Sequence, residues 1–210
     1  MEGYGDFAEL WIMVIICGSM RYARQHKAQT HRRIVKNASR QFRSHGLSGA
    51  GVARVMHASG LTVGGFYKHF RSKDNLLVEA IGESLQDIRR KLLPRAKAAP
   101  TGEGWKEFVK GYLSMEHCDH PEQGCPLAAL AGDISRAKPA MKKDVAVLLK
   151  QHRDEILVFV PGRNAKEKER NFTVAITAMS GAISFARTMA DPEAKQEILD
   201  TVRDHLLSSL

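Results

Sequence analysis

Residues 47–77, LSGAGVARVMHASGLTVGGFYKHFRSKDNLL, decide the fold of this chain. The stretch predicts two short helices joined by a turn at Gly60, followed by the start of a long third helix. Apolar residues recur at helical spacing in both short helices. Ser48, Thr62 and Ser72 are the expected N-caps of the three helices, because each precedes a helical pattern. The spacing is typical of a helix-turn-helix.

The second short helix carries Gly64 and Gly65, each of which costs about 1 kcal/mol relative to alanine in a helix. In a helix that brings its backbone close to a nucleic acid, the missing side chains of these glycines leave room for that approach. Donors for phosphates follow at Lys68, His69, Arg71 and Lys73. An ordinary helical corner with a solvated basic face is the alternative interpretation.

The segment GLTVGGFYKHFRSKDNLL, within a match from about Ala28 to Leu77, resembles the signature of the TetR family of transcriptional regulators. In that family an aromatic-Tyr-x-His-Phe segment ends the helix-turn-helix, and Ser-Lys-Asp/Glu opens a long helix. The matching residues here are Phe66, Tyr67, His69, Phe70, Ser72, Lys73 and Asp74.

We therefore expect a set of DNA contacts from the helix-turn-helix. The base-edge contacts fall to Thr62, Val63 and Lys68, and the resemblance implies that Tyr67 faces the phosphates rather than the core. Arg24 and Lys27 are weaker candidates for the minor groove. The full predicted set is Ser48, Gly49, Arg54, Thr62, Val63, Gly64, Gly65, Tyr67, Lys68, His69 and Lys73.

The charge of the chain is segregated. Residues 20–75 hold 12 Lys or Arg against one acid, whereas residues 1–19 hold three acids and no base. The remaining residues are nearly balanced, so the formal net charge of +9 lies almost wholly on the segment with the motif. A polyanion that contacts this segment is the simplest interpretation.

The 210 residues are 43% apolar, show no strand signal or internal repeat, and predict an all-α protein. We expect an N-terminal extension at residues 1–19, a three-helix DNA-binding unit at 20–75, and a ligand-sensing and dimerisation bundle at 76–210. The extension contains the apolar run 10–17. It fits a translated extension before a true start at Met20, a segment that packs on the body or a partner, or an interfacial anchor.

A basic arm, residues 21–33, is expected to lead into a first helix that ends at Gly46. Phe42, Val52, Met56, Phe66 and Phe70 should form the centre of the three-helix unit. The other expected helices cover residues 72–92, with Pro94 ending that helix, then 105–115, 127–137, 139–160, 167–190 and 192–207, and residues 116–126 are expected to form a loop.

The resemblance implies a homodimer formed by the last two helices, which suits a palindromic operator DNA. A line of small residues on the penultimate helix, Ala175, Ala178, Ala182 and Ala186, allows a close helix contact. A small-molecule inducer, hydrophobic or aromatic, is expected in the bundle. The candidate wall residues, each also a plausible core residue, are Trp105, Phe108, Tyr112, Met115, Cys125, Leu127, Met141, Leu148, Phe172 and Met179.

Three cysteines do not form a disulfide framework and fit a reducing cytoplasm. Cys125 lies in a Gly-Cys-Pro element before a helix, an arrangement that resembles some TetR-like regulators, so it is a candidate redox or electrophile sensor as well as a simple buried residue. A zinc site built from His117, Cys118, His120 and Cys125 has an unfamiliar spacing. We expect no metal and no cofactor.

The sequence thus favours a sequence-specific regulator, a repressor released by a small-molecule or thiol-reactive inducer. We expect no enzyme, since no nucleophile elbow, Walker loop, zinc-protease motif or dinucleotide fingerprint is present. A non-regulatory, nucleoid-type DNA-binding protein is the remaining alternative. The large, nearly neutral distal half argues against it, because sequence-independent binding needs only the basic part.

Overall fold

The computed structural model describes the backbone of residues 5–210 and the side chains from Arg24 onward. Every regular element in this part of the chain is a helix, which confirms the all-α prediction. The elements are α1 (Gly5–Gly49), α2 (Val52–Ala58), η1 (Val63–Lys68), α3 (Lys73–Ala98), α4 (Gly104–Tyr112), α5 (Met115–Asp119), η2 (Pro121–Gln123), α6 (Pro126–Ser135), α7 (Pro139–Ile156), α8 (Ala165–Ala186) and α9 (Pro192–Ser209).

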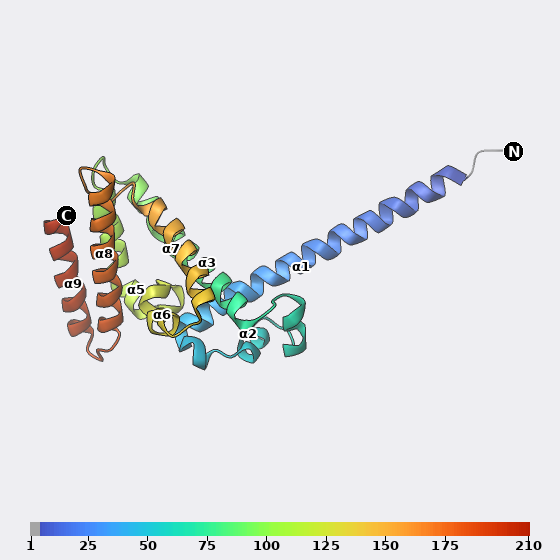
Figure 1. Ribbon diagram of the computed structural model, residues 1–210, viewed down its shortest axis with the longest axis horizontal. Helices are drawn as coiled ribbons and strands as arrows, with labels where there is room; N and C mark the ends of the chain where they lie inside the picture. Colours follow the sequence, from blue (N-terminus) through green and yellow to red (C-terminus); the bar gives the residue numbers. More distant parts are fainter. Residues whose placement is uncertain (1–4) are drawn as a thin grey trace.

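The backbone of α1 projects far beyond the body of the molecule, and α8 and α9 lie side by side at the opposite end (Figure 1). The basic residues expected as an arm are part of this helix. A positive φ of 68° at Gly46 breaks the helical path where the sequence predicted its end, and one further turn leads to Gly49. The packing predicted for the run 10–17 lies outside the described side chains. Within residues 5–210, no helix has the length and apolar character needed to span a bilayer.

The helix-turn-helix consists of α2 and η1, with Gly60 at a φ of 68° between them. The prediction that Ser48 caps the first helix is wrong, since α2 begins after Gly51 and has no side-chain cap. Thr62 occupies the predicted N-cap position of η1 without making a capping hydrogen bond. The second helix is a 3₁₀-helix, consistent with the low helix propensity of the two glycines it contains.

The long helix α3 links the helix-turn-helix to the rest of the chain. Ser72 caps it as predicted, because its hydroxyl accepts a hydrogen bond from the Asn75 backbone N–H at 3.1 Å. Pro94 was expected to end the helix, but α3 continues through it to Ala98. Leu92, Leu93 and Ala96 are buried in the distal core, and this packing holds the last turn despite the missing N–H.

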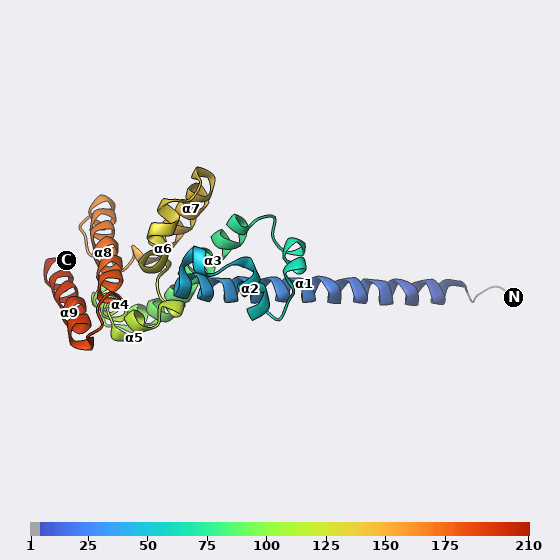
Figure 2. The same cartoon turned by 90° about the horizontal axis from the view of Figure 1, so that it is seen from below.

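Two hydrophobic cores lie along α3. The first contains the predicted centre of the three-helix unit, with Phe42, Met56, Phe66 and Phe70 buried and Val52 packed against them. It also includes Leu130 of α6 and residues of α7. Viewed from below, α6 and α7 lie between α8 and the helix-turn-helix (Figure 2). The helix-turn-helix therefore shares a packed core with α6 and α7.

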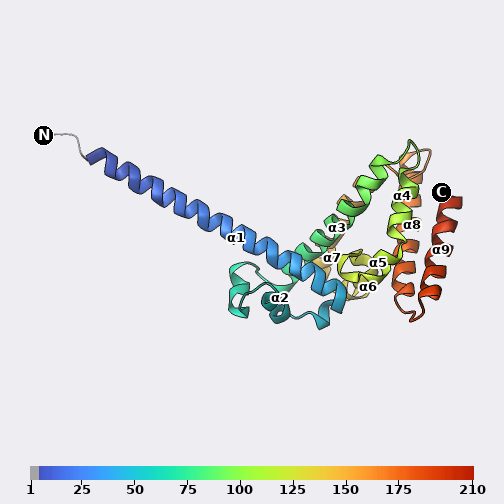
Figure 3. The ribbon, with the colours of Figure 1, turned by 180° about the vertical axis from the view of Figure 1, so that it is seen from behind.

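The second core is formed by the distal part of α3 together with α4, α8 and α9. These helices lie at one end of the molecule (Figure 3). The segment expected as a loop, residues 116–126, contains most of α5 and all of η2, so that expectation is wrong. The small residues of α8 mostly face inward: Ala175, Ala182 and Ala186 are buried in this core. Their small side chains serve packing within the chain.

Candidate nucleic-acid interface and ligand cavity

The helix-turn-helix exposes most of the residues predicted to contact DNA. Gly65 and His69 are half-buried. Among the larger side chains, Tyr67 is 78% exposed and Val63 is 51% exposed. The exposed members of the set are Ser48, Gly49, Arg54, Thr62, Val63, Gly64, Tyr67, Lys68 and Lys73. They come from the end of α1, from α2 and η1, and from the start of α3, which are neighbouring elements.

Phe66 and Phe70 explain why Tyr67 and Lys68 face outward. Both phenylalanines are 3% exposed, and their rings stack with centroids 5.5 Å apart. These two anchors fix the rotation of η1, so Tyr67 and Lys68 project away from the core while His69 is half-buried. This arrangement excludes the alternative in which the Tyr67 side chain is buried in the corner. The Tyr67 ring lies edge-on to the Phe66 ring, with centroids 5.2 Å apart.

Lys73 ties the start of α3 to the end of α1. Its ammonium group donates to the Leu47 carbonyl at 2.9 Å, and the Leu47 N–H donates to the Asp133 carboxylate of α6 at 3.3 Å. The lysine is exposed and its Nζ has donors left for a phosphate. The hydrogen bonds place this cation beside the helix-turn-helix and connect that region to the distal helices.

His69 lies beside a basic hollow on α1. The rings of His31 and Phe70 stack with centroids 4.5 Å apart, and the Nε2 of His31 lies 2.6 Å from the Glu79 carboxylate. Burial, with further contributions from His31 and nearby lysines, lowers the pKa of His69 below its ordinary value, so at neutral pH it is a hydrogen-bonding group rather than a cation. The hollow is lined by Arg24, Lys27, Ala28, His31, Arg32 and His69. The sequence analysis did not name His31 and Arg32 as candidates; they lie four and five residues beyond Lys27, about one helical turn away.

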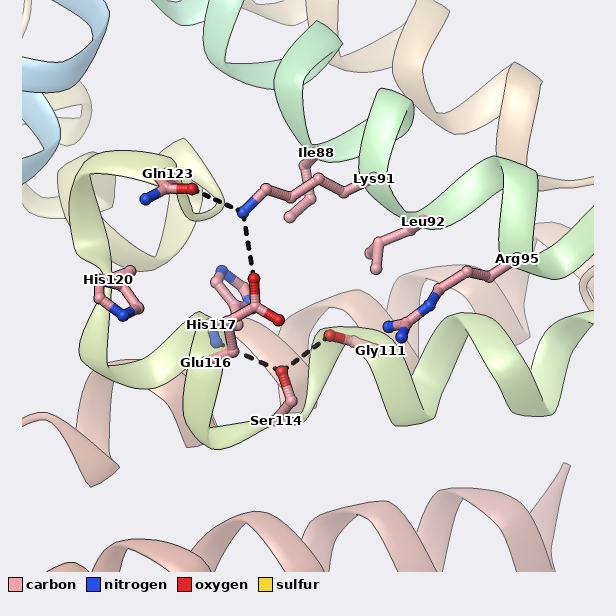
Figure 4. Close-up of a pocket in the computed structure, with 10 residues that line it drawn as sticks. All are labelled: Ile88, Lys91, Leu92, Arg95, Gly111, Ser114, Glu116, His117, His120 and Gln123. Atoms are coloured by element: carbon pink, nitrogen blue, oxygen red, sulfur yellow. Dashed lines mark hydrogen bonds and ion pairs between the residues drawn. The ribbon is translucent and has the colours of Figure 1, made fainter.

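A cavity of about 270 Å³ lies between α3 and the segment from α4 to η2 (Figure 4). Its lining is Ile88, Lys91, Leu92, Arg95, Gly111, Ser114, Glu116, His117, His120 and Gln123. Most of these residues are polar or charged, whereas the sequence had suggested apolar and aromatic ones.

The residues predicted to form the ligand pocket lie elsewhere. Met141 belongs to the core beneath the helix-turn-helix, and Leu148 packs against it. Met115 and Leu127 pack against the distal core. The other predicted residues, Trp105, Phe108, Tyr112, Cys125, Phe172 and Met179, are buried in the distal core. The structure does not bring the predicted set together around the cavity of Figure 4.

His117 joins the wall of the cavity to the start of α6. The Nδ1 of His117 lies 2.6 Å from the Tyr112 carbonyl, and its Nε2 accepts the Cys125 N–H at 2.8 Å. These partners fix the neutral tautomer with the proton on Nδ1. Burial lowers the pKa of His117 to about 4, so the ring stays neutral at pH 7. A Cβ on Gly124 would come within 2.7 Å of this ring, and the glycine is what allows the close approach.

Two arginines, the buried Arg43 and the half-buried Arg187, hydrogen-bond to the same segment. Arg43 of α1 donates to the Gly124 carbonyl at 2.7 Å and to Asp87 of α3 at 3.1 Å. Arg187, just after α8, donates to the His117 and Cys118 carbonyls at 2.8 and 2.9 Å. The segment 117–124, which includes part of the cavity wall, is thus hydrogen-bonded both to α1 and to the residue after α8.

The geometry around His117 and Cys125 bears on two hypotheses, a reactive thiol at Cys125 and a zinc site. Cys125 is 0% exposed, so a reagent reaches its sulfur only after the start of α6 moves. Both ring nitrogens of His117 are already hydrogen-bonded. Among the described residues, no three His, Cys, Asp or Glu side chains gather closely enough to hold a metal ion.

Comparisons with known proteins agree with this architecture. Residues 34–80 match the family described as bacterial regulatory proteins, tetR family. The HTH-type transcriptional regulator LmrA of Bacillus subtilis strain 168 is 30% identical over 105 residues, which cover 49% of this chain and 56% of that protein. The chain therefore spans little more than half the length of this curated relative.

Solved structures resemble the chain over most of its length. A TetR transcriptional regulator from Chloroflexus aurantiacus has a TM-score of 0.71 at 21% identity, covering 88% of this chain and 95% of that one. A TetR-family regulator from Cytophaga hutchinsonii has a TM-score of 0.70 at 19% identity, with 87% and 96% covered. Fold and site together define a helix-turn-helix protein with a helical C-terminal body. Residues 34–80 thus belong to the TetR-family DNA-binding domain, and the chain has the fold of the solved TetR-family regulators.

Proposed function

We propose that the protein is a sequence-specific DNA-binding transcriptional regulator. The observation that carries this proposal is the exposed helix-turn-helix surface, on which Thr62, Val63 and Lys68 are accessible while Phe66 and Phe70 fix η1 from behind. These three residues are assigned to base edges, and Tyr67, His69 and Lys73 to phosphates. Residues 20–75 form the DNA-binding unit, and residues 76–210 sense and dimerise.

The operator is the direct test of this proposal. Selection of bound duplexes from a random pool should return a two-fold symmetric site, because two copies of η1 related by a dimer axis read two half-sites. Failure to retain any duplex at low salt would contradict the proposal. We further propose that the protein is a repressor and that a small molecule in the distal bundle releases it from this operator.

Replacing Lys68 with Ala should weaken binding to the selected operator. If Lys68 also neutralises one phosphate, the slope of log affinity against log salt should fall by about 0.9. Fluorescence anisotropy at several salt concentrations measures both quantities. Lys166→Ala removes the same charge from an exposed position at the start of α8 and should leave both unchanged. If the two variants had the same operator affinity and the same salt slope, Lys68 would not be part of the DNA interface.

We also propose a homodimer through α8 and α9. The outer face of α8 exposes Val174 and Phe185, each 56% exposed, and a Cβ added at Gly181 between them would meet nothing within 4 Å. An accessible apolar face with a glycine at its centre suits close approach of a second helix.

Phe185→Lys should dissociate the dimer, because a lysine would be buried there without a partner. The dimer dissociation constant, measured by analytical ultracentrifugation, should rise about 30-fold or more, which corresponds to ~2 kcal/mol. Val158→Lys makes the same change at a residue that is 69% exposed outside α8 and α9, and it should have no effect. A monomeric parent protein, or an unchanged Phe185→Lys dimer, would contradict the proposed interface.

A further inference from the structure

The cavity between α3 and α5 carries two cations on one helix. Lys91 and Arg95 are four residues apart on α3, so their side chains lie on the same face. Figure 4 shows both side chains reaching into the cavity, from its two ends. Besides His117 and His120, the lining carries these two positive charges against the single negative charge of Glu116. The cavity is therefore positive overall.

The two cations differ in the partners that they have within the chain. Lys91 donates to Gln123 at 2.9 Å and lies 3.6 Å from the Glu116 carboxylate, which is itself largely exposed. Arg95 has no ion-pair partner among the residues that the structure describes. Its guanidinium lies over Gly111, where an added Cβ would be 3.7 Å from Nη1 and 2.7 Å from Leu92. The absence of a side chain at Gly111 leaves this space open.

The other lining residues limit the size and chemistry of a ligand that could pair with Lys91 and Arg95. Ile88 and Leu92 of α3 supply apolar surface next to the charges, and both are nearly fully buried. His117 offers no free donor, since both ring nitrogens are hydrogen-bonded within the chain. The volume of about 270 Å³ is close to the lower end of the ~300–1,000 Å³ usual for small-molecule sites. The site suits a small ligand with one acidic group and a short apolar body.

We propose that this cavity binds a small organic carboxylate, with the acid group paired to Arg95 and Lys91 and the apolar body against Ile88 and Leu92. The planar guanidinium of Arg95 matches a carboxylate through two parallel hydrogen bonds. The ligand displaces Glu116 from Lys91. This inference rests on the proposed control by a small molecule and names the chemical class of that molecule.

The test is a thermal-shift measurement on the full chain without DNA. The probes are benzoate, hexanoate and octanoate, each paired with its neutral amide. At a tenfold excess over its dissociation constant, a carboxylate should raise the Tm by about 3–5 °C, whereas its amide should raise it much less. Arg95→Gln should abolish the carboxylate shift. Lys97→Gln removes one charge from an exposed position on the same helix outside this cavity and should keep the shift.

The outcomes are separable from those of DNA binding. No carboxylate shift, an equal shift with carboxylate and amide, or a shift kept in Arg95→Gln would each overturn the proposal. A folded Arg95→Gln protein is recognised by an unchanged Tm in plain buffer, and Lys91→Gln provides a second variant if it is not. Since no DNA is present, a negative result would leave the operator proposal standing, and loss of operator binding would leave the ligand result standing.

Discussion

Arg43→Met should lower the free energy of unfolding by about 2–4 kcal/mol, measured by urea denaturation. The Arg43 side chain is buried and donates to the Gly124 carbonyl, to Asp87 and to Ser39 of its own helix. Methionine keeps much of the apolar stem but leaves the Gly124 carbonyl without this donor. Asp87 keeps its ion pair with Arg90 at 2.7 Å, which limits the loss.

Arg40→Met is the matched control for this substitution. Arg40 lies three residues earlier on α1 and is exposed, so its replacement should change the stability by no more than about 0.5 kcal/mol. An Arg43→Met protein as stable as the control variant would show that the buried hydrogen bonds contribute little. The variant bears on the proposed regulation as well, because Arg43 hydrogen-bonds from α1 to the segment that forms one wall of the proposed ligand cavity. If ligand release of DNA acts through this contact, Arg43→Met should bind the operator with a weakened response to ligand.

Acidification should destabilise the protein between about pH 6.5 and pH 4. Burial lowers the pKa of His117 and of His152 to about 4 each, below the ordinary 6.5. The unfolded chain therefore binds more protons than the folded chain in this window, and stability falls as the pH falls. Above pH 6.5 both states are neutral and the two histidines add no pH dependence. At pH 5 each should remove about 2 kcal/mol from the free energy of unfolding, or ~4 kcal/mol together.

Two variants separate this effect from general acid sensitivity. His152 packs beside Arg89 with its Nε2 lacking a partner among the described residues, so His152→Gln should fold and should lose about half of the decrease between pH 7.5 and pH 5. His205→Gln changes an exposed histidine of α9 and should keep the full decrease. Urea denaturation at the two pH values measures each. A decrease of the same size in His152→Gln as in the parent would exclude His152 as a source.

The helix-turn-helix could be predicted because its signals are local. Gly60 marks a turn by its conformation, Ser72 caps the helix it precedes, and Phe66 and Phe70 are spaced to share one face. Most of the predicted DNA-facing residues follow from the same spacing, and the resemblance to the TetR family implied the outward direction of Tyr67. The errors at this end are also local: Ser48 lies within one more helical turn, and α2 starts at Gly51 without a side-chain cap.

The distal half could be predicted only as helices. Apolar periodicity does not distinguish a core residue from a pocket wall, so Trp105, Phe108 and Met179 were natural ligand candidates, and packing has buried them in the core. Pro94 is a helix breaker by its own chemistry, yet the burial of its neighbours outweighs that tendency. The segment 116–126 has loop composition, and its short helices depend on contacts with α1 and α8.

The sequence by itself therefore determined the helical class, the place of the DNA-facing helix-turn-helix and the segregation of positive charge, since each follows from residues close together in the chain. Only the tertiary structure decided where the candidate ligand cavity lies and how its wall connects to α1. Lys91 donates to Gln123 and Arg43 donates to Gly124, through contacts between residues 32 and 81 positions apart. Such contacts form when helices pack, and no periodicity within one helix specifies its partner.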